Sequence, residues 1–194
     1  MRRLLLAASL AIVAGCGTPA KLNYYTLSSQ GPAAPAAVPA AARPISVYVG
    51  PVTIPETVDR PQMVFRVDAN QVEIADLERW AEPLKAAIPR LVAETLAREV
   101  AGSTVMTSRQ SATLDFDYRV ALDVQRFDFS AGDGSAVDVL WTIRAAKGAP
   151  RTGRTEAREA GGSRDAQAMA AAHSRALEKV ARDIAAAIRG MPPS

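Results

Sequence analysis

Residues 115–130 read DFDYRVALDVQRFDFS, and this stretch decides the fold. From residue 116 to residue 124 apolar side chains alternate with polar ones, which is the period of a strand with one buried face. Beyond that point the apolar positions move to Phe127 and Phe129, so the spacing predicts a β-bulge near Gln125-Arg126. The stretch is therefore predicted to be a long strand whose buried face continues past an irregularity.

A second strand is predicted to return beside the first. AGDGS, residues 131–135, has the glycine and aspartate content of a hairpin loop. We expect residues 136–146 to pair antiparallel with the first strand and to be followed by a solvated, charged edge strand around residues 152–157. The inward positions of the return strand are Val137, Val139, Trp141 and Ile143.

Shorter strands are predicted upstream of the hairpin. Gly50-Pro51 interrupts the first of them and predicts a bulge or bend there. Asp76 is expected to cap a turn that contains LERWAE, residues 77–82. The predicted strands are residues 45–54, 62–67, 72–74 and 104–107.

Two helices complete the predicted domain. The first is expected after Pro83, with Pro89 kinking it or starting it afresh, and it ends at Gly102. The second is expected to run from a cap at Ser163 to Gly190. Strands, helix, strands and helix around an antiparallel hairpin predict an α+β fold, with a two-layer arrangement of a mostly antiparallel β-sheet and two main helices packed on one face.

The first sixteen residues have the order of an export signal followed by a lipid-attachment site. Arg2 and Arg3 are positive, and residues 4–14 form an apolar run that is too short to span a bilayer. VAGC, residues 13–16, resembles the lipobox of bacterial lipoproteins, in which the cysteine is acylated and becomes the first mature residue. We predict acylation of Cys16, with palmitate as a typical chain; the alternative is a chance cysteine at an ordinary cleavage site.

The segment after Cys16 is predicted to be a tether. Gly17 stands where an Asp would favour inner-membrane retention in the enterobacterial pattern, so export to the outer membrane is favoured. Residues 28–44 are rich in Pro and Ala, as low-complexity linkers are. YYTL, residues 24–27, is either part of the tether or a strand that docks back onto the domain. The predicted divisions are a signal peptide over residues 1–15, a lipidated tether over 16–44 and a folded domain over 45–194.

Removal of the signal peptide changes the charge of the chain. The whole sequence has 23 Lys and Arg against 20 Asp and Glu, and loss of Arg2 and Arg3 leaves 21 basic residues. A nearly neutral mature chain lacks the basic excess that binding to nucleic acid phosphates requires. We therefore expect no nucleic acid partner.

The residue inventory argues against an enzyme. His173 is the only histidine and lies on the apolar face of the last predicted helix, so a core or interface role is favoured over a catalytic one. Cys16 is the only cysteine, whereas zinc sites use three or four nitrogen or sulfur ligands in most proteins. We predict no catalytic residue, no metal and no cofactor.

Four aspartates lie along the long predicted strand, and they allow two interpretations. They could form a carboxylate pair for hydrolysis or a calcium site. The simpler interpretation is a solvated sheet face, with Arg119 between the carboxylates and a cross-strand charge pair to Arg144. The four residues are Asp115, Asp117, Asp123 and Asp128.

RWAEPL, residues 79–84, contains the aromatic residue whose role is least clear from sequence. Trp80 precedes the first helix, and a core position and an exposed interface position are equally compatible with its neighbours. The candidate docking or oligomer interface is Arg79, Trp80, Glu82 and Pro83.

Together with the lipobox and YYTL, three further segments carry a family resemblance. The chain resembles the ABC-type transport auxiliary lipoprotein family, of the PqiC/YmbA type, over nearly the whole mature sequence. The most specific part is the gapped pattern that joins the first two segments. The segments are RPQMVFR at residues 60–66, RWAEPL at 79–84 and AAAHSRALEKVARDIA at 170–185.

The resemblance implies a function that the residues alone do not. It implies a non-enzymatic periplasmic lipoprotein, anchored in the outer membrane through Cys16, that assists an MCE or ABC-type system in lipid transport or envelope integrity. Its implied partners are MCE-domain or ABC transporter subunits, copies of itself in a ring, and phospholipid. The alternatives are a structural lipoprotein for outer-membrane assembly or cell-wall attachment, and a periplasmic hydrolase.

Overall fold

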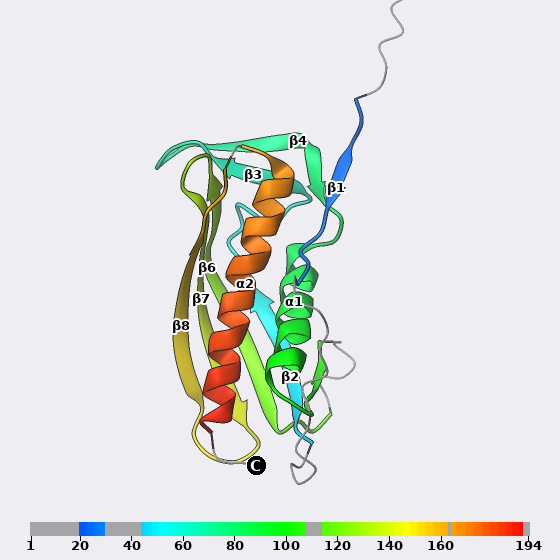
Figure 1. The fold of residues 1–194 in the computed structure, drawn as a ribbon, viewed down its shortest axis with the longest axis vertical. Coiled ribbons are helices and arrows are strands. Elements are labelled where there is room, and N and C mark those ends of the chain that lie inside the picture. Colours follow the sequence, from blue (N-terminus) through cyan, green and yellow to red (C-terminus); the bar gives the residue numbers. More distant parts are fainter. Residues whose placement is uncertain (1–19, 30–43, 108–113, 163, 192–194) are drawn as a thin grey trace, which may run out of the picture.

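The long hairpin lies at the centre of the fold. The computed structural model describes residues 20–29, 44–107, 114–162 and 164–191. In this part of the chain eight strands form one sheet, and two helices cover one of its faces (Figure 1). The strands are β1 (Asn23–Tyr25), β2 (Ser46–Thr53), β3 (Gln62–Arg66), β4 (Val72–Trp80), β5 (Thr104–Met106), β6 (Tyr118–Ser130), β7 (Gly134–Ala145) and β8 (Arg151–Glu159), and the helices are α1 (Leu84–Glu99) and α2 (Ala166–Arg189).

The predicted hairpin and its bulge are confirmed. β6 and β7 pair antiparallel, and their register shifts between Val124 and Arg126. This extra residue turns Phe127 and Phe129 towards the same buried side as the apolar residues before it, and both are almost fully buried. β8 pairs with β7 as the predicted edge strand.

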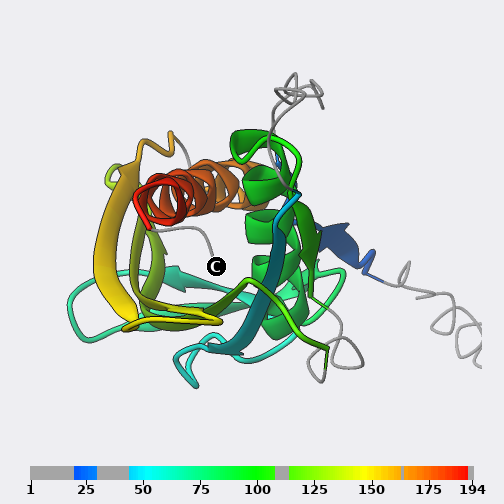
Figure 2. The same cartoon turned by 90° about the horizontal axis from the view of Figure 1, so that it is seen from below.

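The other strands make the sheet mixed. β2 runs parallel to β6, and its register shifts between Val49 and Val52, where the Gly50-Pro51 peptide bond is cis. β5 and β3 also pair parallel with their neighbours β2 and β6, whereas β3 and β4 form an antiparallel pair. The α+β prediction is confirmed, and the sheet curves around the two helices (Figure 2).

Both helices pack their apolar faces against the sheet and each other. α1 continues through Pro89, so the prediction of a fresh start there is wrong. Pro89 lies in the second turn, where its missing N–H removes a single bond, the one to the carbonyl of Lys85. α2 begins at a cap formed by Asp165, whose carboxylate accepts a hydrogen bond from the Ala168 amide. The expected cap, Ser163, lies outside the described residues.

The second half of β4 was predicted wrongly. LERWAE was expected to form a turn, but the strand continues to Trp80. Its end pairs with β1, in which Tyr24 and Tyr25 lie opposite Arg79 and Trp80. This pairing supplies backbone hydrogen bonds that the polar local sequence did not signal.

The segment YYTL is therefore a docked strand. β1 adds to the sheet through β4, and Leu27, which follows it, is 1% exposed in the core. The folded body thus includes residues that precede the Pro- and Ala-rich segment. Residues 30–43 of that segment, the signal peptide and Cys16 all lie outside the described residues. Among the described helices, none combines the length and the apolar character needed to cross a bilayer.

Candidate functional site

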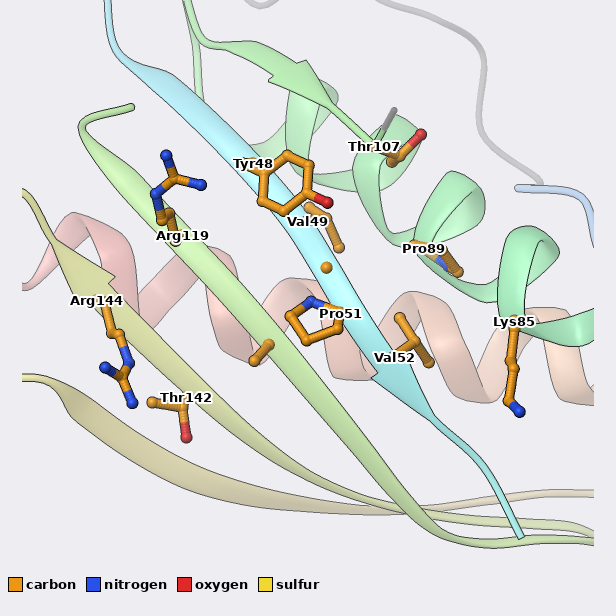
Figure 3. A pocket seen from close by; sticks show the side chains of 12 residues that line it. Tyr48, Val49, Pro51, Val52, Lys85, Pro89, Thr107, Arg119, Thr142 and Arg144 are labelled. Carbon is orange, nitrogen blue, oxygen red and sulfur yellow. The ribbon is translucent and has the colours of Figure 1, made fainter. Parts of the chain in front are cut away.

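A groove of about 500 Å³ opens on the face of the sheet that is turned away from α2. Figure 3 shows Tyr48 and Pro51 of β2 along its middle, with Arg119 and Arg144 on one side. Pro89 and Lys85 of α1 lie on the other side, beyond β2. The groove thus has an apolar centre and cationic flanks.

The two arginines of the groove are brought together by strand register. Arg119 of β6 lies directly opposite Arg144 of β7, so two like charges face each other across the pair. Such a pair is unfavourable unless an anion or a partner compensates it. The guanidinium of Arg119 lies 5.7 Å from the ring centroid of Tyr48, and it donates a hydrogen bond to the Leu114 carbonyl. Arg144 is exposed and makes no ion pair with any described residue.

The expected charge pair between Arg144 and the strand aspartates is not formed. Asp117 instead accepts hydrogen bonds of 2.7 and 2.8 Å from the backbone amide and hydroxyl of Ser46. Asp123 accepts one of 2.5 Å from the Thr53 hydroxyl. These two carboxylates therefore hold β2 against β6, and neither forms an ion pair with Arg144.

The aspartates also do not converge on a metal or catalytic site. Asp128 forms ion pairs of 2.9 Å with Arg66 and 2.7 Å with Arg126, at the opposite end of β6 from Asp117. Burial alone would raise the pKa of Asp128, but the hydrogen bonds from both arginines outweigh burial and leave this pKa lowered. In the described part of the chain no group of three His, Cys, Asp or Glu side chains is placed to hold a metal ion.

The described lining of the groove is cationic and carries several hydroxyl groups. Among the described residues the lining contains three cations and the hydroxyls of Tyr48, Thr107 and Thr142, but no carboxylate, histidine or cysteine. Lys85 is already paired with Asp59 at 2.6 Å, whereas Arg144 is an exposed cation of the lining without an ion pair among the described residues. Guanidinium groups bind carboxylate and phosphate through paired hydrogen bonds. The arrangement therefore has the chemistry to bind an anionic group.

The predicted interface residues have structural contacts of their own. Trp80 is 5% exposed, and its ring packs near Phe127 in the core. Glu82 binds Arg90 at 2.6 Å, and Arg90 also donates to the Leu27 carbonyl at 2.7 Å. Arg90 of α1 is therefore tied both to the RWAEPL segment and to the residues just after β1.

A surface for docking nevertheless remains at this segment. Arg79 and Glu82 are half-buried, while Pro83 is exposed at the start of α1. A second concavity of about 360 Å³ is lined by residues 59–61 and 80–84. A docking role for Arg79, Glu82 and Pro83 remains a prediction.

His173 occupies the centre of the core. Its Nδ1 lies 2.6 Å from the Ser135 hydroxyl oxygen, and its ring stacks on Phe127 with centroids 3.8 Å apart. The side chain is fully buried, so no substrate in solution reaches this serine–histidine pair. Burial lowers the pKa of His173 to about 3, which keeps the imidazole neutral. These contacts support the core interpretation made from the sequence.

The depressed pKa predicts a pH-dependent stability. The unfolded chain binds a proton at His173 below about pH 6.5, and the folded chain does not until about pH 3. The contribution of His173 to stability is therefore fully present above pH 6.5 and is lost as the pH falls, at about 1.4 kcal/mol per pH unit. Urea unfolding at pH 7, 6, 5 and 4 should show this slope.

A His173→Gln variant isolates the contribution of His173 to the pH dependence of stability. The variant should be less stable than the wild type at pH 7, and the difference should shrink as the pH falls towards 4. Titration of Asp128 and the other carboxylates affects both proteins and cancels in the difference. A difference that stays constant with pH would contradict a neutral, buried His173.

The fold is thus a two-layer α+β domain with a cationic groove. The family model described as ABC-type transport auxiliary lipoprotein component matches residues 25–185. The chain therefore belongs to the family of ABC-type transport auxiliary lipoprotein components, an auxiliary transport family rather than an enzyme family. The match begins within β1, in agreement with the docking of that strand on the sheet. None of the curated proteins matches the chain.

Solved structures of other proteins are similar to this chain. A crystal structure of an uncharacterized protein is 17% identical, with a TM-score of 0.67 over 87% of this chain and 99% of that one. A protein from Xanthomonas campestris, of the family DUF330, is 20% identical, with a TM-score of 0.57 over 84% of this chain and 92% of that one. The PelC dodecamer from Paraburkholderia phytofirmans is 19% identical, with a TM-score of 0.42 over 74% of this chain and 91% of that one. At these identities the likeness of the first two structures concerns the fold alone.

Proposed function

We propose that the protein is a non-enzymatic accessory subunit of an MCE or ABC-type system for lipid transport or envelope integrity. In this proposal acylated Cys16 holds it on the periplasmic face of the outer membrane. The observation that carries the proposal is the family match over residues 25–185, which covers nearly all of the described domain. The lipobox and the binding character of the groove are consistent with it.

The docking of β1 on the sheet limits how far the folded domain can lie from Cys16. Six residues, 17–22, separate Cys16 from Asn23, the first residue of β1. A fully extended chain of that length bridges about 25 Å. The Pro- and Ala-rich segment comes after β1 and so adds nothing to this reach. We therefore propose a domain held close to the membrane, in place of one on a long tether.

The groove is the proposed contact with a partner subunit. Arg119 and Arg144 lie near the beginning of β6 and the end of β7, in the half of the molecule opposite β1 and β4 (Figure 1). In this proposal the groove lies far from the end of the domain that is held at the membrane. A carboxylate of a periplasmic protein can reach it there, whereas a lipid phosphate of the same membrane cannot. We propose that an acidic segment of the MCE-domain or ABC transporter subunit binds there.

Crosslinking in cells, followed by purification and mass spectrometry of proteins and lipids, tests the proposal. We expect recovery of an MCE-domain or ABC transporter subunit, and native mass spectrometry of the same sample should show the ring of identical copies. Arg144→Gln should reduce recovery of the partner about tenfold, as expected for loss of a charge-assisted contact. Arg158→Gln, at another exposed arginine without an ion pair among the described residues, should leave recovery unchanged.

The alternative functions predict other results. Recovery of only outer-membrane assembly factors or cell-wall fragments would replace the transport proposal with a structural one. Equal recovery from the Arg144→Gln and Arg158→Gln proteins would remove the groove from the partner interface.

A further inference from the structure

Exposed apolar side chains gather at one end of the described domain. Ile74 and Leu77 of β4 are 40% and 41% exposed, and Tyr24 of β1 is 60% exposed. Figure 1 shows β1, β3 and β4 together at this end, with β4 crossing it. The further members of this group, which we call the end patch, are Leu22, Val67 and Val72.

Strand pairing places much of the end patch on the outer face of β4. Glu73 lies opposite Phe65 on the inner side, where Arg164, just before α2, bonds Glu73 and lies 5.3 Å from the Phe65 ring. The neighbouring residue Ile74 therefore points away from the helices. At the other end of the strand Trp80 faces the core, so Arg79 and the residue opposite it, Tyr24, face outward.

The end patch lies where the chain leaves for the predicted anchor. Leu22 and Tyr24 flank the first residue of β1, and Cys16 is six intervening residues away. The start of β1, and the end of β4 that pairs with it, thus stay close to the acylated residue, with Asn23 within about 25 Å of it. Several exposed apolar side chains gathered at one end of a domain are typical of a contact surface, and tyrosine is enriched where protein meets the headgroups of a membrane.

The charges around the end patch do not form a basic surface that would attract anionic lipids. Lys21 and Asp76 are both exposed, and Glu78 accepts a hydrogen bond of 3.0 Å from Asn23 within the sheet. Positive and negative groups are thus mixed here, unlike the basic clusters that bind anionic lipids. A contact with the membrane would rest on the apolar side chains.

We infer that the end patch lies against the membrane that holds Cys16, at the boundary between headgroups and acyl chains. The inference rests on the proposed acylation of Cys16 and adds an orientation to it. The β1 and β4 end faces the lipid, and the groove faces away from it. The acyl chains provide the attachment, and the end patch fixes which way the bound domain points.

Quenching by brominated phospholipids tests this orientation in the acylated full chain, reconstituted into phospholipid vesicles. We compare Ile74→Trp with Leu140→Trp, because Leu140 of β7 is 42% exposed and lies outside the end patch. The native Trp80 and Trp141 are 5% and 8% exposed and give both variants the same background. Tyr24→Trp provides a second position in the end patch if Ile74→Trp alters the fold.

We expect brominated lipid to quench about half of the fluorescence that the introduced tryptophan contributes in Ile74→Trp. In Leu140→Trp the fluorescence of the introduced tryptophan should change little. Equal quenching of the two variants, strong or weak, overturns the inference. Emission from Ile74→Trp that is shifted to the blue but not quenched also overturns it and assigns the end patch to a protein contact. Mass spectrometry of the same samples separates the two proposals, because a Cys16 without acyl chains overturns the anchor and the orientation together.

Discussion

Replacing Cys16 with alanine is expected to remove the protein from the outer-membrane fraction. Each buried CH₂ of an acyl chain contributes about 0.8 kcal/mol to membrane binding, and two or three chains on one residue hold a protein stably. Without the thiol there is no site for these chains, so the protein should be released or stay as an unprocessed precursor. Fractionation with antibody detection measures the loss, which should be nearly complete.

The folded domain should be unaffected by this change. Leu27 is the first buried core residue of the described chain, and it lies eleven positions beyond Cys16. Circular dichroism and the urea midpoint of the Cys16→Ala chain should therefore match those of a mature chain without acyl groups. Gly17→Asp is the matched control, because it keeps the thiol and should move the protein to the inner membrane in bacteria that follow the enterobacterial rule. A Cys16→Ala protein that still fractionates with the outer membrane would refute the anchor.

The hairpin was predictable because its signals are local. Apolar alternation runs through both strands, a glycine-containing loop joins them, and the switch of the apolar positions at Phe127 revealed the bulge. The end of β4 was not predictable in this way. Its pairing partner is β1, more than fifty residues earlier in the chain, so no window around Trp80 contains the information.

The groove could not be predicted for a related reason. Whether Arg144 lies opposite an aspartate or opposite Arg119 depends on the register of β6 and β7, and the position of the bulge sets that register. A shift of two residues would have placed a carboxylate there. The composition of a strand indicates which face is polar, but only the pairing determines which charges meet.

Phe127→Ala is expected to cost about 3–5 kcal/mol of folding free energy, the largest effect on stability among these predictions. Phe127 is 2% exposed, and its ring lies between two elements that are distant in sequence. It stacks on His173 of α2 and lies 6.4 Å from the Trp80 ring of β4, measured between centroids. Truncation leaves a cavity where the sheet, α2 and the RWAEPL segment meet.

Urea unfolding of Phe127→Ala beside Leu140→Ala measures this cost. Leu140 lies on the exposed face of the same hairpin, so its truncation should change stability by less than about 0.5 kcal/mol. Since Phe127 and His173 are in ring contact, the double variant Phe127→Ala with His173→Gln should lose less than the two single losses together. Additive losses would mean that the contact between the two rings contributes nothing to stability beyond their separate burial.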